Sequence, residues 1–358
     1  MEPFSLHVSS NAVVTGLRTP AAAKPPPKDT PLIVALHGGS YSADYYNATP
    51  VNSASPYSTF LGVPFIAINR PGYKDSTALP DALPEGRTFL QVEGRYLHNE
   101  ILPAVWKAYA TDYGVTSIVI LAHSLSAPMT IVAAALNATE TSPSFNEERQ
   151  EQRQNDGNVE GQGLEREQNT SDEEEGKTQE ASAKENAGSY PLAGIILSGF
   201  GTTANVPTMT RIQPLVDPNA PRITFPVSLK DELMLFPPSA GFTDPEVYEK
   251  TEELNTSASV VEFVDGIHIW PSYWREKYAK HVKCPVLYAL AEKDCFWMST
   301  QEAIEDFAGA FENSVRVDKG VVLGGIHCLE LCRAGRGWYA RVFGWAVECG
   351  VAFGMRGK

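Results

Sequence analysis

Basic residues and cysteines are both scarce in this chain of 358 residues. It holds 29 Lys and Arg residues against 43 Asp and Glu residues, a formal net charge of −14 at pH 7. Because nucleic-acid backbones are bound by clustered Lys and Arg, this charge argues against nucleic-acid binding. The five cysteines all lie in the last quarter of the chain. Their odd number argues against a disulfide framework and favours a reducing, cytoplasmic location.

Long apolar runs are also missing. No segment approaches the ~18 uninterrupted apolar residues that a membrane-spanning helix needs. The first residues do not show the basic stretch and apolar core of a secretory signal. A metal site at His327, Cys328 and Cys332 is conceivable, but no second cluster of ligands accompanies them. We therefore expect neither a metal nor a cofactor.

What the chain does contain is an alternation of apolar runs and helical spacing. Antiparallel strands are predicted at 4–8 and 12–17, and buried strands at 32–36, 63–69, 116–121, 192–198, 285–290 and 315–323. Helices are predicted at 53–61, 85–113 with a kink at Pro103, 127–136, 301–311 and 333–349. This alternation predicts an α/β fold with a mostly parallel, twisted sheet of about eight strands flanked by helices.

Two segments interrupt the pattern. Residues 141–190 include a tract with thirteen acidic and five basic residues and no aromatic residue, between 147 and 185. Such a tract buries too little apolar surface to fold, so we predict a disordered acidic insertion. Residues 202–282 are rich in proline and aromatic residues, which favours a helical lid over an active site or an ordinary subdomain. The core would then comprise residues 1–140, 191–201 and 283–358.

One serine stands where a nucleophile would be expected. Ser124 directly follows a buried strand and precedes a helix, so a sharp turn would expose its hydroxyl at the edge of the sheet. A serine hydroxyl becomes a strong nucleophile when an imidazole takes its proton and a carboxylate orients the imidazole. Asp294 and His327 each follow another predicted strand, at the same edge. Asp306 and Asp318 are alternative acids, but they occupy predicted helix-surface and strand positions.

This arrangement resembles the α/β-hydrolase superfamily, whose members carry Ser, Asp and His in that chain order. Residues 32–39 are similar to the family's oxyanion strand with its His-Gly turn, and residues 68–73 to its Arg-Pro-Gly-Tyr turn. Residues 290–297 look like the acid loop, and residues 325–327 like the histidine loop. The resemblance covers nearly the whole chain except the acidic insertion.

The resemblance implies a catalytic triad of Ser124 as nucleophile, His327 as base and Asp294 as acid. The chain departs from the family pattern beside the nucleophile, where Ala122 and Ser126 replace the usual glycines. These larger residues would crowd the turn.

The resemblance also implies an oxyanion hole formed by the backbone N–H groups of Leu125 and of Gly39 or Ser40. We expect further contacts with the substrate from Tyr41, His123, Trp270 and Trp297.

The predicted function is that of a serine hydrolase that cleaves an ester, thioester or lactone of a hydrophobic small molecule. Two alternatives keep the fold: a lyase, cyclase or acyltransferase of natural-product metabolism, and a non-catalytic ligand-binding protein. In each case the expected partner is a small molecule, and the sequence leaves the oligomeric state open.

Overall fold

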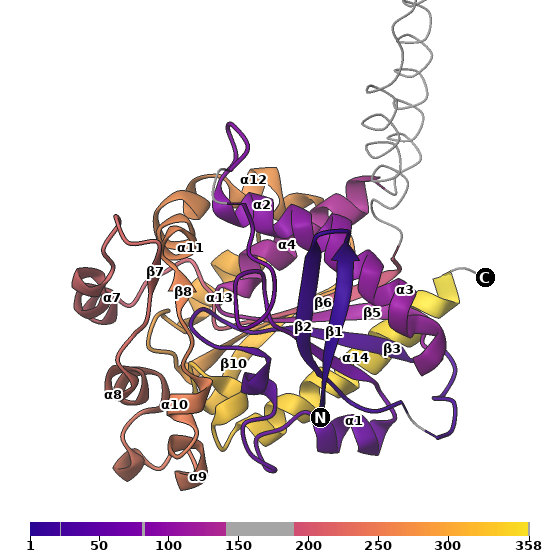
Figure 1. Cartoon of the computed structure of the whole chain (residues 1–358), viewed down its shortest axis with the longest axis horizontal. Coiled ribbons are helices and arrows are strands. Elements are labelled where there is room, and N and C mark those ends of the chain that lie inside the picture. Colours follow the sequence, from indigo (N-terminus) through magenta and orange to yellow (C-terminus); the bar gives the residue numbers. More distant parts are fainter. Residues whose placement is uncertain (22, 81–82, 141–189, 357–358) are drawn as a thin grey trace, which may run out of the picture.

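The structure is a computed structural model that describes residues 1–21, 23–80, 83–140 and 190–356. The predicted acidic insertion therefore lies outside the described residues, apart from Tyr190 at its end. The remaining chain forms a central sheet with helices on both faces (Figure 1).

The sheet has eight strands in the order β1-β2-β4-β3-β5-β6-β9-β10. Only β2 runs against the others, because it pairs antiparallel with both β1 and β4 while all remaining pairs are parallel. This confirms the predicted mostly parallel sheet. The strands are β1 (Glu2–Ser9), β2 (Ala12–Arg18), β3 (Pro31–Leu36), β4 (Phe65–Ile68), β5 (Ser117–His123), β6 (Leu192–Ser198), β9 (Val286–Lys293) and β10 (Val317–Ile326).

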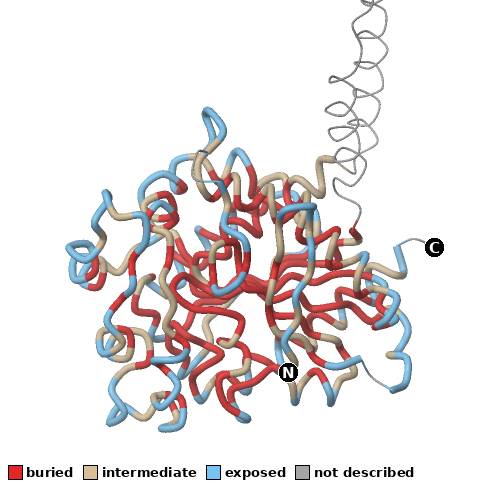
Figure 2. The backbone as a smooth tube through the Cα atoms, in the orientation of Figure 1, coloured by how far each residue is buried: buried red, intermediate tan, exposed pale blue. Residues whose placement is uncertain are grey.

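Two apolar clusters cover the two faces of the sheet. In β3, Leu32, Val34 and Leu36 belong to one cluster, and the alternate residues Ile33 and Ala35 belong to the other. Both sets are fully buried, so a continuous apolar run was a correct sign of a central strand (Figure 2). One face is covered by α2 (Phe89–Tyr96), α3 (Leu102–Tyr113), α4 (Ser126–Glu140) and α13 (Gln301–Ala308), and the other by α1 (Ser55–Leu61) and α14 (Gly335–Arg356).

The long helix predicted at 85–113 is interrupted before its proline. A π-helical turn at Leu97–Ile101 separates α2 from α3. Pro103 directly follows this turn, at the start of α3, and as a proline it has no N–H group to donate to the preceding turn. The interruption therefore begins one turn earlier than the kink predicted from Pro103.

Residues 202–282, which we call the 202–282 segment, are inserted between β6 and β9. Figure 1 shows that much of this segment gathers at one end of the molecule. Its helices are short because prolines and polar turns recur throughout it. The regular elements are α7 (Val206–Ile212), β7 (Arg222–Ile223), α8 (Val227–Lys230), α9 (Pro245–Tyr248), α10 (Thr251–Leu254), β8 (Ala258–Ser259), α11 (Val260–Val264) and α12 (Trp274–Lys277).

None of the helices in the described ranges is both long enough and apolar enough to cross a bilayer.

Candidate active site

Ser124 occupies a strained turn between β5 and α4. Its φ of 56° lies in the left-handed region, which costs a residue other than glycine about 1–2 kcal/mol. The turn is held by two backbone hydrogen bonds: Ser124 N donates to Ser198 O at 2.7 Å, and Ala127 N donates to Ser124 O at 2.9 Å. The sharp turn predicted at Ser124 is therefore present.

The residues that replace the family's glycines fit this turn. Ala122 and Ser126 are fully buried. The Ser126 hydroxyl is accommodated because it donates to the carbonyl oxygens of Leu36 and His123, each at 2.8 Å. A side chain at Gly38 would not fit in the same way, since a Cβ atom there would lie 2.9 Å from Ser124 Cβ. Glycine is thus required in the neighbouring turn, and serine is tolerated at position 126.

Asp294 and His327 form a buried pair. His327 Nδ1 donates to both carboxylate oxygens of Asp294, each at 3.0 Å. Asp294 Oδ1 also accepts the N–H groups of Phe296 at 2.9 Å and Trp297 at 3.1 Å, which fixes the carboxylate in the loop after β9. Because Nδ1 carries the proton, Nε2 of His327 is the nitrogen that can accept another.

The alternative acids lie elsewhere. Asp306 is bound by Arg275 and Thr202 on the surface. Asp318 accepts hydrogen bonds from Arg316 and Trp345. Asp294 is therefore the acid that the fold brings to His327.

Ser124 and His327 line one pocket at the carboxyl edge of the sheet. They do not form a direct hydrogen bond, and both hydrogen bonds of the His327 ring go to Asp294. Gly199 allows the rings of His123 and His327 to approach one another: a Cβ atom at this glycine would lie 2.6 Å from His123 Cε1 and 3.2 Å from His327 Cε1. Its φ of 64° is a second reason for glycine at this position.

His123 is held rigidly beside His327. Its ring stacks on Tyr45 with centroids 5.1 Å apart and lies 5.0 Å from the His327 ring. Nδ1 of His123 is 3.2 Å from Ser198 Oγ. Burial lowers the pKa of His123 well below its usual value, and the neighbouring His327 lowers it further. His123 is therefore neutral, and it lines the pocket as expected.

The turn after β3 brings the predicted oxyanion residues together. A Cβ atom at Gly39 would lie 2.6 Å from Leu125 Cδ1, so the turn and the residue after Ser124 are adjacent. Ser40 is buried and has a φ of 59°, again left-handed. His37 anchors the turn, because its Nδ1 bonds Gly38 O at 2.8 Å and its Nε2 accepts Arg70 N at 3.1 Å.

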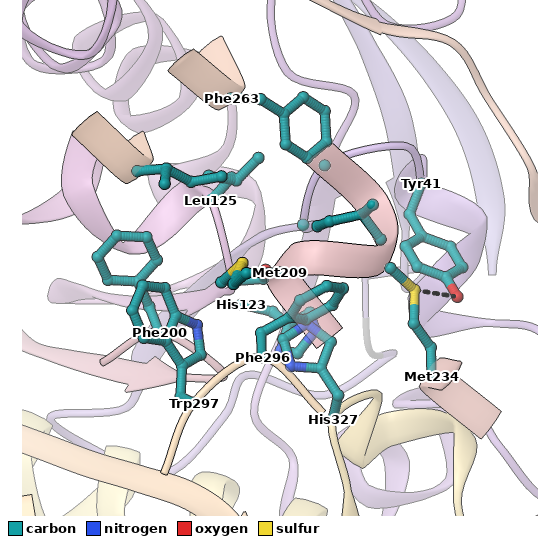
Figure 3. Close-up of a pocket in the computed structure, with 15 residues that line it drawn as sticks. Tyr41, His123, Leu125, Phe200, Met209, Met234, Phe263, Phe296, Trp297 and His327 are labelled. Carbon is teal, nitrogen blue, oxygen red and sulfur yellow. Dashed lines mark hydrogen bonds between the residues drawn. The ribbon is translucent and has the colours of Figure 1, made fainter. Parts of the chain in front are cut away.

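The pocket itself is apolar. Figure 3 shows Tyr41, Trp297 and His327 around it, with the Tyr41 hydroxyl pointing to Met234. Tyr41 and Trp297 thus lie where contacts with a substrate were expected. The apolar lining consists of Leu125, Phe200, Met209, Ile212, Met234, Phe263, Ile267, Phe296 and Trp297.

Trp270 does not line this pocket. It is 1% exposed, and its ring stacks on Trp274 and Tyr278 within the core cluster on the α4 face. The expectation that Trp270 contacts the substrate is corrected accordingly, because packing against other aromatic rings covers its surface.

Several lining residues were not predicted from the sequence. Met209, Ile212, Met234 and Phe263 all come from the 202–282 segment. Phe263 lies close to the turn after β3: a Cβ atom at Gly39 would lie 3.0 Å from Phe263 Cζ. The aromatic and apolar content of the segment indicated a contact with the site, but not which residues make it.

Asp294, Cys295 and His327 are the residues here that could approach a metal ion. In the described part of the chain, each places one candidate ligand atom within 4.8 Å of the others. Asp294, however, already accepts His327 and two backbone N–H groups. Burial also raises the pKa of the Cys295 thiol, which disfavours the thiolate form. The cluster is therefore better described as a hydrogen-bonded pair with a neighbouring thiol.

The sheet order and the turns at its carboxyl edge define the α/β-hydrolase fold, and solved structures agree. No protein-family model and no curated protein sequence matches the chain. It is similar to a structure described as a putative lipase from Acinetobacter baumannii, with 13% identity, a TM-score of 0.54, and coverage of 98% of this chain and 92% of that one.

Two further similar structures are DcsB in complex with its substrate analogue and a proline iminopeptidase from Mycobacterium smegmatis. DcsB has 12% identity and a TM-score of 0.53, and the peptidase 12% and 0.52. Each alignment covers 98% of this chain and 99% of the other. At such identities the similarity establishes that this chain has the α/β-hydrolase fold.

Proposed function

We propose that this protein is a serine hydrolase that cleaves an ester, thioester or lactone of a hydrophobic small molecule. The observation that carries the proposal is the single pocket lined by both Ser124, in its left-handed turn, and His327, bound to Asp294. The hydrolase names of the similar folds support the same class.

We propose the following reaction for these groups. The Ser124 hydroxyl oxygen bonds to the carbonyl carbon of the substrate while its proton passes to His327 Nε2. The carbonyl oxygen becomes negative and is stabilised by the N–H groups of Leu125 and of Gly39 or Ser40. His327 then protonates the leaving alcohol or thiol as the carbonyl reforms. Water releases the acyl group from Ser124 by the same steps in reverse.

A fluorophosphonate probe tests the activated serine directly. We expect the probe to label the folded protein at Ser124, because the hydroxyl is activated only when His327 can take its proton. The Ser124→Ala variant should not be labelled. The Ser126→Ala variant is the matched control and should still be labelled, since Ser126 is buried and its hydroxyl donates to two carbonyl groups. Peptide mapping by mass spectrometry identifies the modified residue. A folded wild-type protein that takes no label would contradict the proposal.

The apolar pocket supports a hydrophobic substrate, and an adjoining cavity of about 110 Å³ extends it. This volume matches roughly three to four water molecules of ~30 Å³ each, so it admits a short apolar chain. Four side chains of the 202–282 segment line both spaces and so form the wall between them: Met209, Ile212, Phe263 and Ile267. We infer that the acyl or alkyl chain of the substrate extends past these four side chains into the adjoining cavity.

A series of p-nitrophenyl esters with increasing acyl length tests this inference. We expect kcat/KM to rise by up to about fourfold for each added methylene until the cavity is full, because burying one methylene contributes about 0.8 kcal/mol. Val216→Trp, which fills the cavity, should remove this rise while leaving acetate hydrolysis nearly unchanged. Val261→Trp is the control. Val261 lies in neighbouring α11, is 48% exposed and does not line the cavity, so this variant should keep the wild-type profile. The same chain-length profile in both variants would refute the assignment of the substrate chain to this cavity.

We further propose that the 202–282 segment acts as a lid over a hydrolase core formed by residues 1–140, 191–201 and 283–358. The support is that the segment supplies Met209, Ile212, Met234 and Phe263 to the pocket. A lid that completes an apolar pocket excludes water from the reacting carbonyl until the substrate is bound.

A cytoplasmic location is also proposed. All five cysteines are free thiols, and none of the five is exposed. Unpaired buried cysteines are typical of proteins in a reducing compartment.

A further inference from the structure

A lysine is buried directly beside the turn that carries the predicted oxyanion groups. Lys230, at the end of α8, is 5% exposed. Its Nζ donates to Ser40 O at 2.7 Å and to Asn255 Oδ1 at 2.9 Å, and lies 3.7 Å from the centroid of the Tyr41 ring. Among the described residues, no carboxylate forms an ion pair with it. The groups in direct contact with the ammonium are therefore neutral, and one of them, the carbonyl oxygen of Ser40, belongs to the turn at the site.

Ser40 requires such a partner because its backbone is strained. It adopts a left-handed φ of 59°, which residues other than glycine rarely do. Three hydrogen bonds from the 202–282 segment hold it there. Lys230 Nζ and Thr256 N, the latter at 3.1 Å, both donate to Ser40 O, and Thr256 Oγ1 donates to Tyr41 O at 2.8 Å. The turn after β3 is thus held by a segment nearly two hundred residues away in the chain.

We propose that Lys230 is a positioning residue that holds the Ser40 turn in the conformation needed to bind the negative oxygen of the reaction. The inference rests on the proposed function, and it deepens that function by coupling the lid to the oxyanion hole. When the 202–282 segment is in place, Lys230 and Thr256 hold the left-handed turn, and the N–H groups of Gly39 and Ser40 are directed toward Leu125. If the segment moves away, the turn relaxes and the oxyanion hole is lost. The active site is then assembled only in the closed state.

The charge on Lys230 predicts a pH dependence of kcat, which a role in packing alone would not produce. The titratable groups that face it are Tyr41, Cys328, Asp231 and His37. Burial lowers the pKa of Lys230 to about 7, although Cys328 and Asp231 act in the opposite direction. As the pH rises through this value the ammonium becomes a neutral amine, and its hydrogen bond to Ser40 O weakens. The wild-type kcat should therefore decline on the alkaline side.

The experiment compares Lys230→Met with Lys250→Met in the full chain, with p-nitrophenyl butyrate as substrate. Lys250 is the matched control because it lies in the same segment but is exposed and pairs with Glu253. We expect Lys230→Met to lower kcat by about 10- to 100-fold, the loss of one charged hydrogen bond, with KM changed by less than about threefold. Its kcat should also lose the alkaline decline near pH 7. Lys250→Met should behave as wild type in all three measurements.

Two outcomes would overturn the proposal: an unchanged kcat in Lys230→Met, or a lowered kcat with the wild-type pH profile, which would assign the lysine a packing role only. If Lys230→Met does not fold, Thr256→Val removes the hydroxyl that holds Tyr41 O, and we expect kcat about three- to tenfold lower. An unchanged kcat in Thr256→Val would then be decisive against the idea. Failure of the proposed function is distinguishable, because Ser124→Ala would then retain the esterase activity of the wild type.

Discussion

Replacing His327 by alanine is expected to lower kcat for a p-nitrophenyl ester by on the order of 10⁴- to 10⁶-fold. The loss is expected to be large because, among the described residues that line the pocket, no other group is placed to take the proton of Ser124 in the proposed reaction. His123 cannot replace His327, since burial and the neighbouring imidazole lower its pKa and its ring is fixed against Tyr45. The measurement is the steady-state rate at saturating ester, with folding checked by circular dichroism. A His327→Ala variant with wild-type kcat would remove the triad from the mechanism.

Asp294→Asn should lower kcat by about 10⁴-fold with little change in KM. The substituted amide can donate to His327 Nδ1, which favours the tautomer with the proton on Nε2, where it blocks proton transfer from Ser124. Asp306→Asn is the matched control, because its partners are Arg275 and Thr202 on the surface. It should retain nearly full activity. Equal losses in the two variants would show that Asp294 is not the acid of this site.

The core strands, and the sheet edge at which the candidate site lies, were predictable because both follow from local patterns. A strand buried on both faces must be a continuous apolar run, as in β3, β5 and β6. Once these strands are parallel, the residues that follow them meet at one edge of the sheet. Ser124 and His327 were brought to one pocket in this way, although more than two hundred residues separate them.

The sequence did not predict which side chains pack into the core and which line the pocket. Trp270 and Trp297 are both aromatic residues near loops, but one is covered by Trp274 and Tyr278 while the other lines the pocket. The position of Ser126 is a similar case. Its hydroxyl fits because two carbonyl oxygens face it, and the sequence carries no sign of them.

Lys230 had no signal in the sequence at all. It is a single lysine in a segment without regular periodicity, and its acceptor Ser40 O lies 190 residues earlier. Contacts of this kind depend on how the 202–282 segment rests on the core. The proposed triad therefore depends on residues at the strand ends, whereas its proposed coupling to the 202–282 segment depends on long-range contacts.

A large effect on stability is expected from Arg70, which joins the core to the 202–282 segment in a fully buried charge network. Arg70 Nη1 donates to Glu93 Oε1 at 2.9 Å and to Glu262 Oε1 at 2.5 Å. Tyr73 donates to Glu262 Oε2 at 2.7 Å. We expect Arg70→Met to lower the free energy of unfolding by about 3–5 kcal/mol, because two buried carboxyl groups lose their cation. Urea denaturation measures the change. Arg211→Met, which breaks an exposed pair with Glu232, is the control and should have no measurable effect.

One carboxyl group of this network should hold a proton at neutral pH. Burial raises the pKa of Glu93 to about 8, with Glu262 raising it and Arg70 lowering it. Between the unfolded value near 4.5 and this folded value, the folded protein binds more protons than the unfolded chain. The free energy of unfolding should therefore fall as the pH rises from about 5 to 8, by at most about 1.4 kcal/mol per pH unit.

Glu93→Gln isolates this effect, since glutamine imitates the protonated carboxyl group. The variant should be nearly as stable as wild type at pH 6, because the wild-type side chain is already neutral there. At pH 9 it should be the more stable of the two, because its side chain cannot ionise in the buried network. Urea denaturation of both proteins at the two pH values gives the comparison. If the two proteins lose stability in parallel as the pH rises, Glu93 is ionised throughout and Arg70 neutralises both carboxylates together.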